Sequence, residues 1–311
     1  MSFELAAEIQ KRYGNVRRAR GCYLYTEKGV RLTDCYLDGG RALLGWDGGK
    51  ARTVFKDTLE RGATGAYCGG YESRLATAVR HLLPGEYTEI RWYYADCRET
   101  CAVSGGSAGG AGADCVSCAP SKMRDLADGA GDAVLWRPWL DICAESTPKQ
   151  TRYPDIKIVH PGTERPAVIK LVPPYPWATS LCIYAFRADV PQNATGAKQE
   201  PGATSATGAE IPPSDVVPTP LLAAYARAFY DLKTALGMFG ENDFKQFSKQ
   251  LSPLFDRRAC WLFPKIPRDS YEDFAKRCLD AGIVVSPHYD VPSIIPWRAN
   301  KGDIKRIADC I

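Results

Sequence analysis

Residues 21–49 constrain the fold of this 311-residue chain more than any other stretch. Two short β-rich runs, 23–25 and 30–33, are joined by a turn that ends in Gly29. Glycine supplies the positive φ that a tight hairpin turn needs. Further glycines follow at positions 39, 40, 45, 48 and 49. They predict a loop in which the backbone bends tightly or closely approaches another group, so a β-hairpin is expected to lead into a glycine-rich loop.

The rest of the chain alternates between helical and β-rich patterns, which is typical of an α/β protein. Amphipathic segments predict helices at 50–62, 71–83, 221–236, 271–281 and 302–310. Apolar runs predict strands at 88–95, 133–140, 155–159, 167–172, 180–186 and 282–286. The inner faces expected for the first and third helices are formed by Val54, Phe55 and Leu59 and by Leu222, Tyr225, Phe229 and Leu232. Residues 191–220 are rich in Pro, Gly, Ala, Ser and Thr, which predicts a long mobile loop outside the core.

Composition and charge narrow the classes of function. The net charge of +4 is spread along the chain, and the basic residues at 17–20 are interpreted as a solvated helix end, so no nucleic-acid partner is expected. No stretch reaches the roughly 18 apolar residues of a membrane helix, and no membrane partner is expected. The N-terminal segment lacks the apolar core of a signal peptide, which predicts a cytoplasmic protein. The twelve cysteines are scattered, which indicates small buried hydrophobic residues rather than a disulfide framework.

The segment from Gly21 to Asp34, with Tyr23-Leu24-Tyr25, Gly29 and Arg31 in it, resembles the entry segment of class III aminotransferases. That family reads G-x-Y-L-Y-D-x-x-G-x-R-Y-x-D and includes glutamate-1-semialdehyde aminomutase. The following order of helix, loop, helix, Pro84-Gly85 and strand continues the resemblance, which covers residues 12–95, 218–236 and 270–311.

This resemblance implies a fold-type I, pyridoxal-phosphate-transferase-like fold. Because the middle of the chain is contracted, a reduced large domain is expected. The resemblance also implies an α/β small domain built from both termini, and a homodimer. The expected division places 1–88 and 237–311 in the small domain and 89–236, with the loop 191–220, in the large domain.

The resemblance also indicates which residues would serve a pyridoxal-phosphate cofactor. Lys170, followed by Val172-Pro173-Pro174 and Tyr175-Pro176, is the candidate for the Schiff base and catalytic base. Asp141, 29 positions earlier, is the candidate partner of the ring nitrogen. A lysine beside a proline turn and a carboxylate that caps a helix or turn are the alternative interpretations of these two residues.

The expected phosphate loop departs furthest from the family pattern. Where the family has N-S-G-T-E-A, this chain has residues 95–100, in which Asp96 is unfavourable for a phosphate dianion. Arg98 and Thr100 are the candidate phosphate-binding residues in this loop. The glycines that follow the family's lysine are also replaced by valine and prolines.

Four cysteines offer a competing interpretation of the same region. Cys97 and Cys101 are followed, after thirteen intervening residues, by Cys115 and Cys118. Four thiolates with one C-x-x-C pair are able to hold zinc or an iron–sulfur cluster. Chance spacing in a cysteine-rich chain is the alternative interpretation, and no metal site is assigned.

Three hypotheses of function therefore remain open. The first is a divergent aminotransferase-like binding or interaction protein, a pseudoenzyme whose pyridoxal-phosphate site is altered or lost. The second is an aminotransferase or aminomutase that uses Lys170 and acts on a small amino compound. The third is a metal-binding protein that uses the four cysteines. The altered phosphate loop favours the first hypothesis, and the spacing of Asp141 and Lys170 favours the second.

Overall fold

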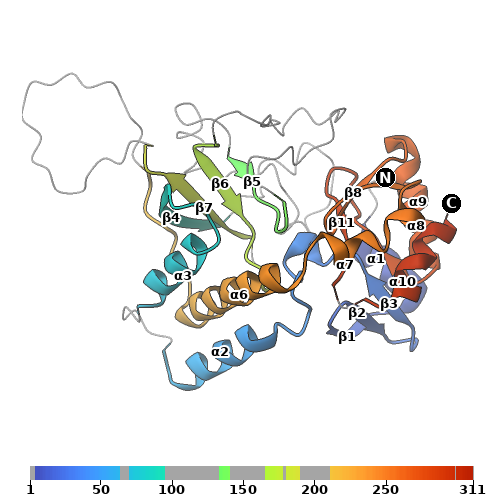
Figure 1. Ribbon diagram of the computed structural model, residues 1–311. Helices are drawn as coiled ribbons and strands as arrows, with labels where there is room; N and C mark the ends of the chain where they lie inside the picture. The colour runs from blue at the N-terminus through green and yellow to red at the C-terminus, as the bar shows by residue number, and fades with distance from the viewer. Residues whose placement is uncertain are drawn as a thin grey trace, which may run out of the picture.

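A computed structural model describes the following residues of the chain: 4–63, 70–94, 133–140, 165–177, 180–189, 211–297 and 299–310. The elements fall into two groups that lie side by side (Figure 1). One group contains both chain ends and is called the terminal part here. The other group is a four-stranded sheet with helices against one face.

The terminal part contains the predicted hairpin. Strands β2 (Tyr23–Thr26) and β3 (Arg31–Asp34) are antiparallel, and Gly29 in the turn has a φ of 77°, which confirms the hairpin and its glycine. The sheet is completed at its two edges by β1 (Val16–Arg20) and by β10 (Ile283–Val284), which is parallel to β3. Residues from the two ends of the chain thus form one sheet.

Helices and a small second sheet surround the hairpin. The sheet consists of β8 (Phe255–Arg258), β9 (Trp261–Pro264) and β11 (Ser293–Ile294). The helices of this part are α1 (Leu5–Tyr13), α7 (Glu241–Lys245), α8 (Ser248–Leu251), α9 (Arg268–Asp280), α10 (Lys301–Lys305) and the 3-10 helix η3 (Arg306–Cys310). The predicted helices at 271–281 and 302–310 and the strand at 282–286 correspond to α9, to α10 with η3, and to β10.

The other group is built on a sheet in the order β4-β7-β6-β5. The strands are β4 (Tyr87–Tyr94), β5 (Val134–Leu135), β6 (Val168–Leu171) and β7 (Leu181–Arg187). Because β7 is antiparallel to both β4 and β6, and β5 is parallel to β6, the strands β4, β5 and β6 all run in the same direction. Their carboxyl ends therefore meet at one edge of this central sheet.

Two helices, α3 (Tyr71–Arg80) and α6 (Thr219–Met238), lie against one face of the central sheet, and a third helix, α2 (Gly49–Glu60), packs against α6 (Figure 1). The predicted inner face of α6 is confirmed, since its four residues are buried. The predicted inner face of α2 is wrong at Leu59, which is 49% exposed. The neighbouring Thr58 is buried instead, and its hydroxyl donates to the Val54 carbonyl.

The packing of α2 and α3 bears on the domain boundaries. Both helices contact α6, which the expected division places in the other domain. The division at residue 88 and the reduction of the large domain stay predictions.

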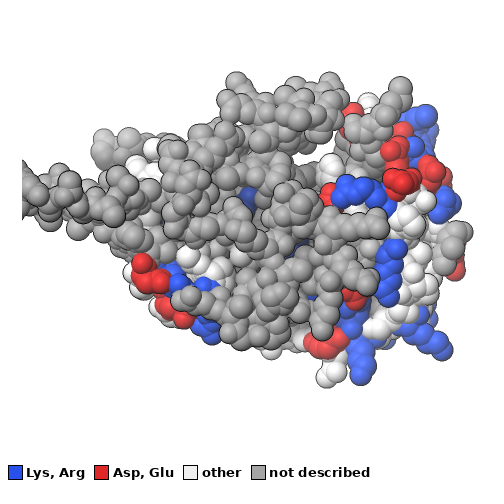
Figure 2. All heavy atoms as spheres, turned by 90° about the horizontal axis from the view of Figure 1, so that it is seen from above, with Lys and Arg blue, Asp and Glu red and all other residues white. Residues whose placement is uncertain are grey.

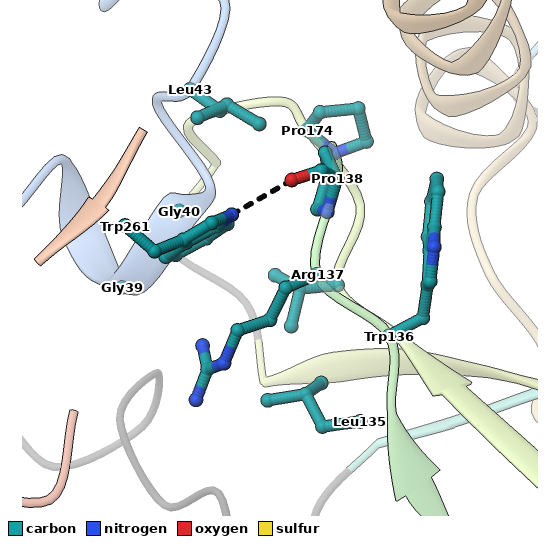
Figure 3. Close-up of a pocket in the computed structure, with 10 residues that line it drawn as sticks. Gly39, Gly40, Leu43, Leu135, Trp136, Arg137, Pro138, Pro174 and Trp261 are labelled. Carbon is teal, nitrogen blue, oxygen red and sulfur yellow. Dashed lines mark hydrogen bonds between the residues drawn. The ribbon is translucent and has the colours of Figure 1, made fainter. Parts of the chain in front are cut away.

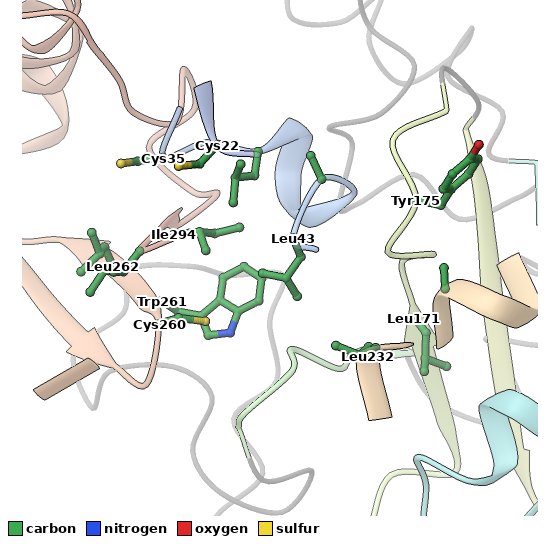
Figure 4. Close-up of a cluster of buried hydrophobic side chains, with 14 of the residues drawn as sticks. Cys22, Cys35, Leu43, Leu171, Tyr175, Leu232, Cys260, Trp261, Leu262 and Ile294 are labelled. Carbon is green, nitrogen blue, oxygen red and sulfur yellow. The ribbon is translucent and has the colours of Figure 1, made fainter. Parts of the chain in front are cut away.

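A hydrophobic cluster runs through both groups of elements. Leu43 lies between Trp261 and Ile294 on one side and Leu171 and Leu232 on the other (Figure 4).

The segment before α6 corrects one expectation. Residues 211–218 belong to the stretch predicted as a loop outside the core, yet Ile211 and Val217 are buried. Asp215 explains this, because its backbone N–H donates to the Trp92 carbonyl and its carboxylate accepts from the Tyr94 N–H at 2.8 Å. The segment therefore lies along β4. The predicted strand at 155–159 and the rest of the loop, 191–210, fall outside the described residues.

The six described cysteines confirm the expectation of buried, unpaired thiols: Cys22, Cys35, Cys182, Cys260, Cys278 and Cys310. Burial raises the pKa of Cys22 to about 11, which keeps this thiol protonated at neutral pH.

The charged side chains are unevenly distributed. In the view from above, the described Lys and Arg residues gather mainly over the terminal part (Figure 2). Within the described part of the chain, no helix combines the length and the apolar character needed to cross a membrane.

Candidate functional site

Asp34, the last residue of the hairpin, organises the glycine-rich loop. Its side chain is buried, and one carboxylate oxygen accepts hydrogen bonds from the backbone N–H groups of Tyr36 and Leu37, each at 2.9 Å. The other oxygen accepts from the Trp46 indole N–H at 2.8 Å. Burial raises the pKa of Asp34, while the three donors oppose that shift by stabilising the carboxylate. One side chain thus holds both ends of the loop.

The five glycines of the loop all have a positive φ, which confirms the expectation of tight bends. Two of them also allow close approaches. A Cβ on Gly40 would lie 3.4 Å from the Trp261 ring, and a Cβ on Gly48 would lie 2.7 Å from the Tyr175 ring. Tyr175 follows β6, so the loop rests directly on the segment that leaves the carboxyl edge of the central sheet.

A pocket lies where this loop meets that edge (Figure 3). Its lining comes from four places in the chain, which are the loop, the end of β5 with the segment after it, the segment that follows β6, and β9. The described lining residues are Gly39, Gly40, Leu43, Leu135, Trp136, Arg137, Pro138, Val172, Pro174 and Trp261. In open α/β sheets, ligands bind outside the carboxyl ends of the strands, so the pocket occupies the position expected of a binding site.

Trp261 connects the terminal part to this edge. Its indole N–H donates to the Pro138 carbonyl at 2.7 Å, and the Arg137 guanidinium lies 5.1 Å from the centre of its ring (Figure 3). Arg137 is 6% exposed. Trp136 and Arg137 project to opposite sides of their strand segment (Figure 3). The pocket thus combines aromatic and apolar walls with one guanidinium group.

Replacing Trp261 by phenylalanine is expected to lower the free energy of unfolding by roughly 1–3 kcal/mol, because the Pro138 carbonyl loses its donor inside the protein. Chemical denaturation measures this change. Trp177, which is 38% exposed, offers a matched control. Its replacement by phenylalanine is expected to change stability by no more than about 0.5 kcal/mol. Equal effects of the two substitutions would contradict the anchoring role of Trp261.

Lys170 is the one candidate cofactor residue that lies within the described residues. It is the third residue of β6 and is 5% exposed. Its register partners are Tyr184 on β7 and Leu135 on β5. Ile169 and Leu171 belong to the cluster on the helix side, so strand alternation places the Lys170 side chain on the opposite face of the sheet. Lys170 is not among the described residues that line the pocket.

The other predicted site residues fall outside the described part of the chain. They are Asp141, Arg98 and Thr100 for the cofactor, and Cys97, Cys101, Cys115 and Cys118 for a metal. Among the described residues, no group of three or more His, Cys, Asp or Glu side chains is arranged to hold a metal ion. Whether Asp141 lies near Lys170 therefore stays a prediction.

The described lining carries few of the groups that pyridoxal phosphate needs. The cofactor requires an amine for its aldehyde, a carboxylate for its ring nitrogen and donors for its phosphate. The described lining supplies neither an amine nor a carboxylate. The segments that follow β5 and β6 carry Pro138 and Pro174, which have no N–H to donate. The described lining therefore lacks two of the three groups that this cofactor requires, and Arg137 is the one charged donor that this lining offers to a phosphate.

Four residues of this region are not singled out by the sequence interpretation. Trp136 and Arg137 stand inside an apolar run, and that pattern predicts only a strand. Trp261 is more than 100 positions away in the chain, and no local pattern connects it to Pro138. Arg41, which stands between the glycines of the loop, is 2% exposed. The only sequence signal for Arg41 is that a charged residue stands inside a glycine-rich loop.

Comparisons with known proteins were made for sequence and for structure. No protein-family model matches the chain. An uncharacterized protein from Treponema pallidum (strain Nichols) is 29% identical, and the match covers 93% of this chain and 91% of that protein. An uncharacterized protein from Borreliella burgdorferi is 36% identical over 64 residues, which are 21% of this chain and 24% of that protein.

Solved structures with a similar fold include an ornithine aminotransferase from Plasmodium yoelii. Its TM-score is 0.55 at 9% identity, and the match covers 95% of this chain and 92% of that one. An acetylornithine aminotransferase from Elizabethkingia anophelis gives a TM-score of 0.52 at 12% identity, with 98% and 96% of the two chains covered. The fold suggested by the hairpin and its loop is therefore confirmed. This chain has, over nearly its full length, the mixed α/β fold of the class III aminotransferases of the ornithine and acetylornithine type.

Proposed function

We propose that this protein is a small-molecule-binding protein that keeps the aminotransferase fold without the usual pyridoxal-phosphate chemistry. The observation that carries the proposal is the pocket at the carboxyl edge of the central sheet. Its described lining has two tryptophans, Trp136 and Trp261, and the guanidinium of Arg137. An apolar pocket with a few convergent polar groups is the usual form of a small-molecule site.

The position of Lys170 supports the same proposal. A lysine that serves as a Schiff base needs its amine at the bound aldehyde. Lys170 lies within a buried strand, on the face opposite the helices, and outside the described lining of the pocket. The substitution of prolines for the family's glycines after β6 agrees with a site that no longer has to hold the cofactor.

An active pyridoxal-phosphate enzyme is the second candidate function. The similarity to aminotransferases over nearly the whole chain favours it, as does the closeness of Lys170 to the carboxyl end of β6. In this case Lys170 acts as the Schiff base, Asp141 binds the ring nitrogen, and the substrate is a small amino compound.

An absorbance titration of the purified protein with pyridoxal phosphate separates the two functions. We expect no Schiff-base band in the visible range, or a weak band that is the same in the wild type and in Lys170→Ala. A strong band that disappears in Lys170→Ala would overturn the proposal and assign the enzyme. Lys233, which is exposed on α6, offers the control substitution, because Lys233→Ala removes an amine far from any assigned role.

The homodimer implied by the resemblance stays a prediction. Light scattering coupled to size-exclusion chromatography measures the mass directly, and a mass close to 34.2 kDa would contradict the dimer.

A further inference from the structure

We propose that Arg41 forms an anion-binding site beside the pocket, and that the ligand is a small organic anion with a carboxylate or phosphate group. This inference rests on the proposed function, because it names the class of ligand that the pocket takes. The Arg41 guanidinium carries a buried positive charge that no carboxylate of the described residues neutralises.

The Arg41 guanidinium is buried without a counter-ion among the described residues. The residue is 2% exposed, and its Nη1 donates to the Leu181 carbonyl at 3.2 Å. Its Nε is buried and has no hydrogen-bond partner in the part of the chain that the structure describes. No carboxylate of the described residues forms an ion pair with it. A buried charge without a partner is strongly unfavourable, so a bound anion gives a physical reason for an arginine at this position.

The hydrogen bond to Leu181 places Arg41 at the carboxyl edge of the central sheet. Leu181 is the first residue of β7 and is opposite Tyr94, the last residue of β4. Two residues further along, Ile183 is opposite Leu171, the last residue of β6. The guanidinium therefore lies where the parallel strands end. Arg41 itself is not among the described lining residues, but Gly40, which precedes it, and Leu43, two positions later, line the pocket.

The free edge of the guanidinium decides the chemistry of the ligand. Nη1 donates to the Leu181 carbonyl, whereas Nε and Nη2 donate to no acceptor among the described residues. Two parallel N–H groups match the two oxygens of a carboxylate or phosphate, which arginine binds in a bidentate manner. The free edge of Arg41 therefore favours an anion over a neutral ligand.

Thermal unfolding in the presence of anions tests the site. Wild-type protein is titrated with sodium phosphate in one series and with succinate in another, and sodium chloride of equal ionic strength serves as the reference. We expect a saturable rise in the unfolding temperature in at least one series, because a ligand that binds only the folded state stabilises it. The series with the lower half-saturation concentration identifies the ligand as a phosphate or a carboxylate.

Three variants assign the effect to Arg41. Arg41→Met is expected to weaken anion binding at least tenfold. In anion-free buffer its unfolding temperature is expected to stay close to that of the wild type, because removing an unpaired buried charge offsets the loss of the hydrogen bond to the Leu181 carbonyl. Arg41→Lys keeps the charge but loses the bidentate edge, so intermediate binding is expected. Arg61→Met removes an equal charge from an exposed position and is expected to behave like the wild type.

Two outcomes would overturn the site. One is a wild-type response to phosphate and succinate no larger than the response to chloride. The other is an undiminished response in Arg41→Met and Arg41→Lys. If Arg41→Met does not fold, Arg41→Lys alone decides, because unchanged binding in that variant contradicts bidentate recognition. Failure of the proposed function is recognised separately, by a cofactor band that depends on Lys170.

Discussion

Replacing Asp34 by alanine is expected to lower the free energy of unfolding by roughly 3–5 kcal/mol. The substitution leaves three donors inside the protein without an acceptor: the backbone N–H groups of Tyr36 and Leu37, and the indole N–H of Trp46. Each unsatisfied buried donor costs about 1–3 kcal/mol, and partial access of water reduces the total. Urea denaturation of Asp34→Ala beside the wild type measures the difference.

A double-mutant cycle separates the two sides of the carboxylate. Asp34→Asn keeps an oxygen for Tyr36 and Leu37 but turns an amide N–H₂ toward the Trp46 indole, so two donors face each other. We expect it to destabilise by about 2 kcal/mol. Trp46→Phe removes the opposing donor, and in that background the Asn substitution is expected to cost about 1 kcal/mol less. Strictly additive effects would show that the contact between Asp34 and Trp46 contributes nothing.

The role of Asp34 explains why the hairpin was so informative. The residue matters in the sequence because it closes the hairpin motif, and in the structure because it fixes the glycine-rich loop that borders the pocket. Glycine, β-branched and aromatic patterns act over a few residues, so the hairpin, the loop and α6 could be predicted locally. The same local patterns placed β4, β6 and β7 within a residue or two of their bounds.

The pocket could not be predicted in this way. It is formed by β9 and by segments that follow β5 and β6, which are brought together only by the tertiary fold. The contact between Trp261 and Pro138 joins residues 123 positions apart. The sequence around Lys170 resembles a family motif, which predicts a Schiff-base lysine there. The orientation of the Lys170 side chain depends instead on the register of the strand. A shift of one residue would turn it to the other face of the sheet.

Arg41 and Asp34 show how the same loop serves packing and binding. The Asp34 carboxylate accepts three hydrogen bonds from groups of the same loop, and these bonds offset the cost of burying its charge. Arg41, seven positions later, has one carbonyl acceptor and an unpartnered Nε among the described residues. The first residue is therefore expected to affect stability under all conditions. The second is expected to affect stability mainly through the anions in solution.

Replacing Gly48 by alanine is expected to lower the free energy of unfolding by roughly 2–4 kcal/mol. Gly48 has a φ of 64°, where a side chain costs about 1 kcal/mol. Its Cβ would also lie 2.7 Å from the Tyr175 ring, which is too short for any real contact, so the ring or the loop has to move. Such overpacking typically adds about 1–3 kcal/mol.

Gly70 provides a matched control for this prediction, because it is the N-cap residue of α3 as Gly48 is that of α2. The backbone angles are nearly the same, with φ and ψ of 68° and 7° at Gly70 and of 64° and 1° at Gly48. A Cβ on Gly70 meets nothing within 4 Å, so Gly70→Ala is expected to cost only about 1 kcal/mol. Tyr175→Ala should reduce the cost of Gly48→Ala to a similar value. Equal costs for the two glycines in the wild-type background would show that the loop does not rest on Tyr175, and the pocket would lose the contact that holds its wall in place.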